Sequence, residues 1–254
     1  SKSDLYAVGD HVCCRSGWQE YYVSNAKDPM TYKVDANAVP LSTYLGVCGM
    51  PGRTAYFGLQ HEGKPQAGET LVVSAASGAV GSVVGQIGKK LGLHVVGVAG
   101  GAEKCAYVKD ELGFDAVIDY KSDDLHAALA AACPNGIDIY FDNVGGEILD
   151  AALRQINYQG TIVLCGGISQ YDNMYEATGP KEYLQMVMQS VRMQGFTMRD
   201  YMHRVPEAIE HLFKARAEGN LIFREHVLEG IEKFPEAFNM LFAGENHGKL
   251  LLKL

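Results

Sequence analysis

Short apolar runs and amphipathic stretches alternate along most of the chain from residue 70 onward. Apolar runs typical of buried strands lie at 70–74, 94–99, 116–119, 137–141, 161–165 and 194–198. Stretches with helical spacing lie between them, at 83–91, 103–112, 123–133, 147–157 and 181–193. Strands that alternate with helices imply crossover connections and a parallel sheet. The pattern therefore predicts a doubly wound α/β fold with a six-stranded parallel sheet, in which ligands bind beyond the carboxyl ends of the strands.

The two ends of the chain show other patterns. Before the sheet, short strands of a mostly antiparallel unit are predicted at 6–15 and 18–23, and a helix at 54–61. After the sheet, helices are predicted at 203–218 and 234–243, and a last strand at 249–254. The chain therefore combines one α/β unit with smaller flanking parts.

The composition is that of an ordinary globular protein, with 47% hydrophobic and 20% charged residues. The net charge of −8 disfavours a broad nucleic-acid surface. No apolar run approaches the ~20 residues of a membrane span, and no signal peptide opens the chain. Six cysteines are scattered without the paired spacing of a zinc site. We therefore expect a cytoplasmic protein with reduced cysteines, and no nucleic-acid or membrane partner.

Residues 75–81, Ala-Ala-Ser-Gly-Ala-Val-Gly, carry the most informative local signal. They connect a predicted strand to a predicted helix, which is the context of a dinucleotide-binding turn. Gly78 would let the backbone approach a pyrophosphate, and Gly81 would let the helix pack close to the sheet. The helix N-terminus would offer N–H groups and a positive dipole end to the phosphates. Ala76 stands in place of the usual first glycine, so the turn alone does not separate a nucleotide site from an ordinary loop.

The end of the second strand indicates which dinucleotide would bind. A carboxylate that holds the adenosine ribose 2′-hydroxyl is expected there, but Gly100-Gly101 follow the strand instead. Lys104 comes next as a cation for a 2′-phosphate, which favours NADP(H) over NAD(H). Glu103 is the opposing residue, and we expect it in the first turn of the next helix, where acids are favoured. The alternative for Lys104 is an ordinary solvated lysine on that helix.

Three further segments occur with this turn in the order and spacing of one family. They are Gly-Met-Pro-Gly-Arg-Thr-Ala-Tyr-Phe-Gly at 49–58, Tyr-Phe-Asp-Asn-Val-Gly-Gly at 140–146 and Gly-Glu-Asn-His-Gly-Lys at 244–249. With them the chain resembles the zinc-independent medium-chain dehydrogenases/reductases of the leukotriene B4 dehydrogenase, prostaglandin reductase and alkenal double-bond reductase group. The similarity covers essentially the whole chain and is greatest to the bacterial curcumin-reductase-like members.

The resemblance implies a cofactor site for NADP(H), residue by residue. The pyrophosphate would be held by Gly78, Ala79, Val80 and Gly81, and the 2′-phosphate by Lys104 and Tyr120. Asn143 would face the adenosine half or the ribose, unless it only caps a helix or forms a turn. The nicotinamide end would involve Thr54, Cys165, Gly166, Ile168, Ser169, Phe196, Thr197 and Met198. Asn246 would close over the cofactor, unless it is an ordinary loop asparagine.

The implied reaction is reduction of the carbon–carbon double bond of a small-molecule enone or enal. Hydride from NADPH would add to the β-carbon, and the charge that develops on the carbonyl oxygen needs a hydrogen-bond donor. Tyr171 is the implied donor, and the cofactor ribose hydroxyl or solvent is the alternative source of the proton. Tyr56 is expected to pack at the domain junction instead. No metal is required.

Three other functions share parts of this pattern. A zinc-dependent alcohol dehydrogenase would need converging Cys and His ligands, and the cysteines offer no four-cysteine lobe. An NADPH:quinone reductase of the same superfamily shares nearly every cofactor residue. A nucleotide-binding but catalytically silent protein is the alternative from another class, and an assay of enone reduction separates it from the enzymes.

The resemblance also implies a domain organisation. Residues 1–48 would be part of a chaperonin-10-like catalytic domain, 49–223 the NADP-binding Rossmann domain, and 224–254 the return to the catalytic domain. Family members carry a longer N-terminal part, so we expect an incomplete catalytic domain with unpaired strand edges, and poor enone reduction by this chain. Members also pair the edge strands of their nucleotide domains, which implies a homodimer.

Overall fold

A six-stranded parallel sheet forms the centre of the computed structural model, which describes residues 3–28 and 30–254. Its strands are β3 (Thr70–Ser74), β4 (His94–Ala99), β5 (Ala116–Asp119), β6 (Ile137–Asp142), β7 (Ile156–Leu164) and β8 (Arg192–Gly195). Their spatial order is β5-β4-β3-β6-β7-β8, so the winding direction reverses between β3 and β6. The predicted doubly wound α/β fold is confirmed, and its ligand crevice is expected at this reversal, beyond the strand ends.

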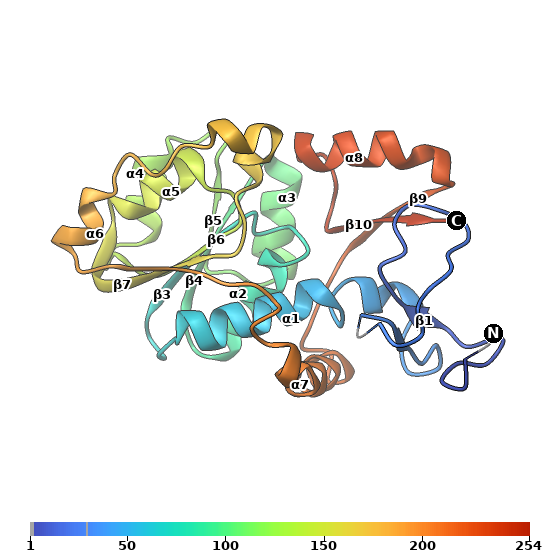
Figure 1. The fold of residues 1–254 in the computed structure, drawn as a ribbon. Coiled ribbons are helices and arrows are strands. Elements are labelled where there is room, and N and C mark those ends of the chain that lie inside the picture. The colour runs from blue at the N-terminus through green and yellow to red at the C-terminus, as the bar shows by residue number, and fades with distance from the viewer. Residues whose placement is uncertain (1–2, 29) are drawn as a thin grey trace.

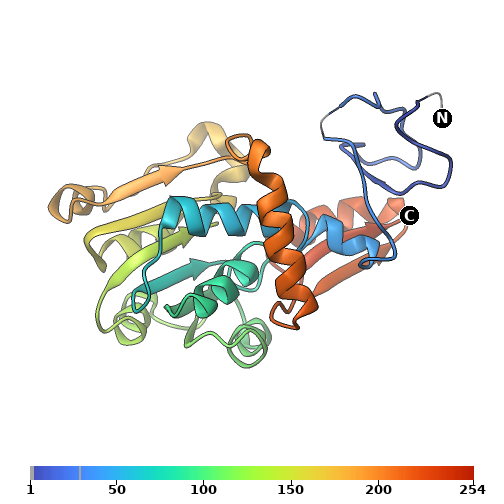
Figure 2. The same ribbon diagram turned by 90° about the horizontal axis from the view of Figure 1, so that it is seen from below.

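Helices cover both faces of the sheet (Figures 1 and 2). One face packs against α1 (Met50–Phe57), α2 (Gly81–Lys90), α3 (Ala102–Ala106) and α7 (Val205–Ala217). The other packs against α4 (Leu125–Ala132), α5 (Gly146–Leu153) and α6 (Leu184–Met188). Leu71 and Val73 of β3 point to the first face and Val72 to the second, and all three are fully buried. Burial on both faces explains why the strands are continuous apolar runs.

The predicted helices differ from the observed ones mainly at their ends. The helix expected at 147–157 ends at Leu153, because β7 already begins at Ile156 and pairs with β6. The helix expected at 181–193 is reduced to α6, since β8 begins at Arg192. The helix at 54–61 begins earlier, at Met50, and continues after α1 as a π-helical turn over Gly58–Gly63. Within the described residues, no helix combines the length and apolarity of a membrane span.

The flanking parts contain less regular structure than predicted. Of the two expected N-terminal strands, 18–23 forms none, and 6–15 contains only β1 (Val12–Cys13), which pairs with β2 (Tyr32–Lys33). A strand needs a neighbour for its backbone hydrogen bonds, and none lies beside 18–23 in the described structure. At the other end α8 (Phe234–Ala243) is confirmed, and β10 (Lys249–Lys253) pairs in parallel with β9 (Glu225–Glu229), a strand that was not predicted.

Candidate functional site

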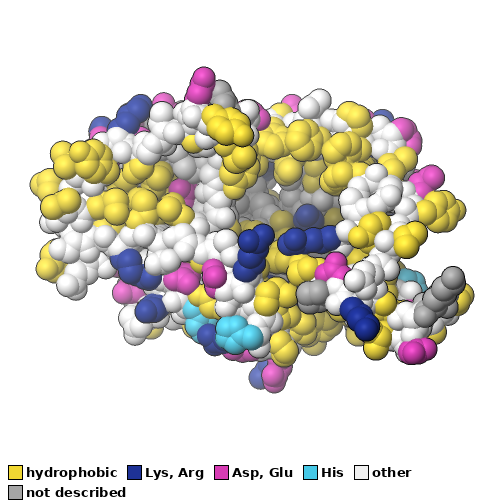
Figure 3. All heavy atoms as spheres, in the orientation of Figure 1, with side chains coloured by type: hydrophobic (Ala, Val, Ile, Leu, Met, Phe, Trp, Pro, Cys, Tyr) yellow, Lys and Arg dark blue, Asp and Glu magenta, His cyan; other side chains and the backbone are white. Residues whose placement is uncertain are grey.

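A cavity of about 700 Å³ opens beyond the carboxyl ends of the sheet strands. The loops after β3, β4, β6 and β7 form one side, and α8 with the start of β10 forms the other. Figure 3 shows the hollow between the two parts, with Lys and Arg side chains at its rim. The described lining contains Lys104 and Lys249 but no Asp or Glu, in a chain with 30 acidic and 22 basic residues. Such a lining favours an anionic ligand.

The glycine turn at 75–81 is tightly built at the N-terminus of α2. Ala75 has a φ of +48° and directs its carbonyl oxygen beneath the turn, where a Cβ on Gly81 would overlap it. A Cβ on Gly78 would lie 3.1 Å from the same oxygen. Ala76 is accepted at the first position because β4 carries Gly97 beneath it, where a Cβ would lie 2.9 Å from the Ala76 methyl. The turn can therefore present free backbone N–H groups to a phosphate despite its unusual first residue.

The predicted phosphate cation and its tyrosine partner do come together, at the ends of β4 and β5. The ring of Tyr120 lies against Gly100, where a Cβ would approach the ring to 2.7 Å. The absence of a side chain at this position therefore both removes the carboxylate and makes room for Tyr120. Lys104 lies beside them and donates from Nζ to the Gly244 carbonyl at 2.6 Å. A lysine ammonium has three N–H donors, so this bond leaves others for an anion.

The charges around Lys104 favour an anion at this end of the cavity. Burial, together with the nearby Lys121 ammonium, lowers the pKa of Lys104. Glu103 lies in the first turn of α3 as predicted, and it is not among the residues that line the cavity. Glu103 and Glu245 oppose this pKa shift, but neither lines the cavity, so a phosphate there would meet the Lys104 ammonium without a lining carboxylate.

Asn143 connects the ends of β3 and β6 beneath the cavity. Its side-chain amide donates to the Ser74 carbonyl at 2.8 Å, and its backbone N–H donates to the Ser74 hydroxyl at 2.8 Å. It neither caps α5, whose N-cap is Gly145, nor adopts a left-handed conformation. The alternatives that Asn143 caps a helix or forms a left-handed turn are therefore wrong.

The neighbouring Asp142 is fully buried and holds the loop after β6. Its Oδ1 accepts hydrogen bonds from the Ser74 and Tyr140 hydroxyls at 3.1 and 2.9 Å, and from the N–H groups of Val144 and Gly145 at 3.0 and 2.9 Å. Its Oδ2 is buried without a partner in the described structure. Burial raises the pKa of the carboxyl, and the hydrogen bonds oppose that shift. Asp142 is therefore a positioning residue that fixes the cavity floor.

The loop after β7 supplies a tyrosine and a thiol to the cavity. The Tyr171 hydroxyl accepts a hydrogen bond from the Gly167 N–H at 3.1 Å, so its own proton is available to a further acceptor. Ser169 ties this loop to the β6 side by donating to the Val144 carbonyl at 2.6 Å. Burial raises the pKa of the Cys165 thiol to about 12, so it is protonated at neutral pH.

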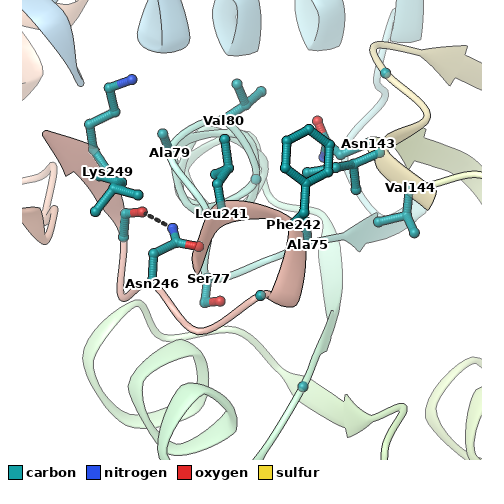
Figure 4. A pocket seen from close by; sticks show the side chains of 18 of the residues that line it. Ala75, Ser77, Ala79, Val80, Asn143, Val144, Leu241, Phe242, Asn246 and Lys249 are labelled. Carbon is teal, nitrogen blue, oxygen red and sulfur yellow. Dashed lines mark hydrogen bonds between the residues drawn. The ribbon is translucent and has the colours of Figure 1, made fainter. Parts of the chain in front are cut away.

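The C-terminal segment closes the opposite side of the cavity (Figure 4). Asn246 donates from Nδ2 to the Gly248 carbonyl at 2.8 Å, and Gly248 forms a parallel β-bridge with Gly78 of the glycine turn. Beyond this bridge the lining is apolar, with Trp18 packed on Phe234 at 4.4 Å between ring centroids. The wall also includes Ala237, Phe238, Leu241, Phe242, Leu250, Leu251 and Leu252. One cavity thus joins a polar, cationic part to an apolar part.

Thirteen of the predicted site residues line this cavity, and four do not. Those that line it are Gly78, Ala79, Val80, Gly81, Lys104, Tyr120, Asn143, Cys165, Gly166, Ile168, Ser169, Tyr171 and Asn246. Thr54, Phe196, Thr197 and Met198 lie outside it. Thr54 is on α1, and Phe196 packs beside Gly58 and Tyr201. Tyr56 donates to Glu207 at 2.8 Å and packs between α1 and α7, so it is a packing residue as expected, but within the 49–223 unit and not at the domain junction.

Sequence reasoning missed Lys249 and the apolar wall of α8. Lys249 ends the Gly-Glu-Asn-His-Gly-Lys segment, but nothing local indicates that this segment returns to the glycine turn. The apolar stripe of α8 predicted a helix but not the cavity that it lines. Among the described residues, no group of three or more His, Cys, Asp or Glu side chains is placed to hold a metal ion.

Comparison with known proteins identifies the family. The model of the family described as "Zinc-binding dehydrogenase" matches residues 79–214. The chain is 44% identical to the NADPH-dependent curcumin reductase of Escherichia coli, over 98% of this chain and 73% of the relative. The chain belongs to the medium-chain dehydrogenase/reductase family.

Other members of this family extend the comparison. The NADP⁺-dependent 2-alkenal reductase of Nicotiana tabacum is 44% identical over 96% of this chain and 71% of its own length. The crystal structure of CurA from Vibrio vulnificus in complex with NADPH superposes with a TM-score of 0.91 at 44% identity, covering 98% of this chain and 74% of that one. A quinone oxidoreductase from Escherichia coli, at 21% identity, shares the fold alone. The resemblance to the enone and alkenal reductase group is thus confirmed.

Proposed function

We propose that this chain is an NADPH-dependent reductase of the carbon–carbon double bond of α,β-unsaturated ketones and aldehydes, and that it acts without zinc. The observation that carries the proposal is the cavity beyond the strand ends. One half of its lining contains lysines and the glycine turn, and the other half is an apolar wall. The relatives at 44% identity are named as reductases of this kind. The first part suits a dinucleotide, and the second suits an apolar substrate.

The cofactor half of the cavity fits NADP(H). The turn from Gly78 to Gly81 at the start of α2 would hold the pyrophosphate, and Lys104 with Tyr120 would hold the 2′-phosphate. Asn246 lines the cavity, and in this proposal it closes over the bound cofactor. Thr54, Phe196, Thr197 and Met198 remain proposals for the nicotinamide end only as the family pattern implies them, because they do not line this cavity.

The substrate end needs a donor for the carbonyl oxygen. When bound, NADPH supplies the hydride that the β-carbon of the substrate receives. The Tyr171 hydroxyl lies on the cavity wall and accepts a hydrogen bond from the Gly167 N–H, so its own proton is free to be donated to a substrate oxygen. It would stabilise the charge that develops on the carbonyl oxygen. Tyr171, the cofactor ribose hydroxyl or solvent then supplies the proton to the α-carbon.

The thiol of Cys165 is compatible with such a substrate. Enones and enals react with thiolates, and a thiolate at the cavity wall would be alkylated. Burial keeps the pKa of Cys165 at about 12, so the unreactive thiol form prevails at neutral pH. The cavity can therefore admit an unsaturated carbonyl compound without consuming its own cysteine.

The decisive experiment measures NADPH oxidation by the purified protein with an enone, an enal or a quinone, and NADP⁺ reduction with a primary alcohol. We expect slow but measurable turnover with the enone or enal, and product analysis should show a saturated carbonyl compound. Turnover with the quinone alone would favour the quinone reductase, and alcohol oxidation that a chelator abolishes would favour a zinc enzyme. Tight NADPH binding without any turnover would leave the catalytically silent protein.

The exposed edge of the sheet supports a homodimer. β8 ends the sheet, so its outer backbone groups have no partner strand in the described chain. Nearby apolar side chains are exposed, among them Tyr158, Tyr183, Leu184, Val187 and Met188. We propose that two copies pair along β8, because an uncovered apolar edge favours association. Light scattering on the protein as it elutes from a size-exclusion column should give twice the mass of one chain. A monomer at micromolar concentration would refute the proposal.

We further propose the domain division that the family resemblance implies. Residues 49–223 would form the NADP-binding unit, with 1–48 and 224–254 as parts of a catalytic domain. The separate β9–β10 and β1–β2 pairs support this division, because neither joins the central sheet. Limited proteolysis should cut first near the two boundaries, and early cuts within 49–223 would contradict it.

We also propose that the protein is cytoplasmic, and fractionation of cells would test this location.

A further inference from the structure

The segment at 196–201, which follows β8, begins beside the cavity. β8 pairs in parallel with β7, and Gly195 is level with Leu164. Phe196 therefore leaves its strand next to Cys165, which lines the cavity. Both side chains pack on the same cluster of buried core residues. The segment thus borders the cavity at the β7 and β8 end of the sheet.

This end of the cavity is where the nicotinamide half of a bound dinucleotide would lie. The strand order is β5-β4-β3-β6-β7-β8. Lys104 and Tyr120 follow β4 and β5, the glycine turn follows β3, and Tyr171 follows β7. A dinucleotide with its 2′-phosphate at Lys104 and its pyrophosphate at the glycine turn would extend past β6 toward β7 and β8. Its second nucleotide half would therefore lie beside the 196–201 segment.

Glu62 holds the far end of this segment from the π-helical turn after α1. Its carboxylate accepts a hydrogen bond from the Tyr201 hydroxyl and lies 3.7 Å from the Arg192 guanidinium, which also donates to the Glu62 carbonyl. The Glu62 side chain is only 17% exposed, so solvent screens these contacts little. The Tyr201 ring stacks on Phe57 at 4.5 Å between ring centroids. Burial and the bond to Glu62 raise the pKa of Tyr201 to about 12, so it donates as a neutral hydroxyl.

Between its two ends the segment forms a turn closed by its own hydrogen bonds. The Thr197 N–H donates to the Asp200 carboxylate at 2.9 Å, and the Asp200 N–H donates to the Thr197 carbonyl at 3.1 Å. At the start of the segment, the Phe196 ring fills the space beside Gly58, where a Cβ would lie 2.6 Å from the ring. The distance of the turn from the cavity therefore depends on Phe196 at one end and on Tyr201 at the other.

We propose that Glu62 is a positioning residue, which fixes the 196–201 segment at the nicotinamide end of the cavity through the Tyr201 hydroxyl. The inference rests on the proposed function, because it assumes a dinucleotide in the cavity. Residues 196–198 lie outside the cavity lining, so their approach to a nicotinamide depends on where Tyr201 holds the segment. A segment released from Glu62 would have to be ordered again when the cofactor binds, and that ordering costs conformational entropy.

The test compares binding of NADPH with binding of 2′-phospho-ADP-ribose, which has the same phosphate groups but no nicotinamide. In Tyr201→Phe we expect the dissociation constant of NADPH to rise by about threefold to tenfold, because a contact that orders the segment is lost. The dissociation constant of 2′-phospho-ADP-ribose should not change. Glu62→Ala should show the same pattern, and the double variant should lose no more than Glu62→Ala alone. Glu62→Gln keeps an acceptor for the Tyr201 hydroxyl, so it should retain most of the NADPH affinity.

Tyr56→Phe is the matched control for these variants. Tyr56 likewise donates to a glutamate, at 2.8 Å from Glu207, and it joins α1 to α7. In the described structure it makes no hydrogen bond to the 196–201 segment. Its loss should therefore lower stability without separating the affinities for the two ligands.

The possible results separate this inference from the proposed function. Unchanged NADPH affinity in Tyr201→Phe overturns the inference, and so does an equal loss for both ligands, which would be a general effect on the fold. Wild-type protein that binds NADPH no more tightly than 2′-phospho-ADP-ribose also overturns it, because the segment then adds no affinity at the nicotinamide. Wild-type protein that binds neither ligand refutes the proposed function and the inference together. If Glu62→Ala does not fold, Tyr201→Phe decides, because it keeps the ring that stacks on Phe57.

Discussion

Replacing Tyr171 by Phe is expected to lower kcat for an enone by about 100-fold and to leave the NADPH dissociation constant within about twofold. The hydroxyl lies on the cavity wall, and the Gly167 N–H already occupies one of its lone pairs. In the proposed function the hydroxyl donates its free proton to the substrate oxygen, where charge develops only during reaction. An interaction made only in the transition state lowers kcat and kcat/KM together. The measurement is steady-state turnover, with the dissociation constant from a separate titration.

Tyr175→Phe is the matched control for this prediction. Tyr175 lies on the same short helix (Ile168–Glu176), and its side chain is fully exposed and outside the cavity lining. Its loss should change neither kcat nor KM. Unchanged turnover in Tyr171→Phe would assign the donor role to the cofactor ribose hydroxyl, to solvent or to another tyrosine.

Replacing Lys104 by Ala is expected to weaken NADPH binding by about 10- to 100-fold while changing NADH binding by less than about twofold. Lys104 lies where Gly100 replaces a ribose-binding carboxylate and where Tyr120 adds a ring and a hydroxyl. Its ammonium is half-buried, so solvent screens its attraction for a phosphate less than at an open surface. Fluorescence titration of both cofactors measures the preference.

Two comparisons keep this result specific. The wild-type protein should bind NADPH more tightly than NADH, and equal affinities would refute the assigned preference. Lys253→Ala removes an exposed charge that pairs with Glu229 on the surface and is not part of the cavity lining, so it should shift neither titration. A loss of NADH affinity as large as the loss of NADPH affinity in Lys104→Ala would place this lysine at the pyrophosphate instead.

The central sheet could be predicted strand by strand because its signals are local, although β7 begins five residues before the predicted run and β8 begins two residues before it. β3, β4 and β5 begin and end where the apolar runs do, since each strand is buried on both faces. Predictions failed where neighbours decide the structure. Residues 18–23 have a strand-like composition but no strand beside them, so their backbone groups form no ladder. Residues 154–157 have helical spacing, yet β7 takes over from Ile156, where it pairs with β6.

The sequence by itself predicted the glycine turn, the missing carboxylate at Gly100 and the cation Lys104, and the family resemblance added Tyr120 beside that lysine. Each depends on what directly follows a strand, and the carboxyl ends of adjacent parallel strands must meet at one edge. Only the tertiary structure decided that Gly248 pairs with Gly78, that Lys249 lines the cavity, and that α8 forms its apolar wall. These contacts join residues from opposite ends of the sheet unit. Their geometry depends on how the whole chain packs, which no local pattern of hydrophobic and polar residues encodes.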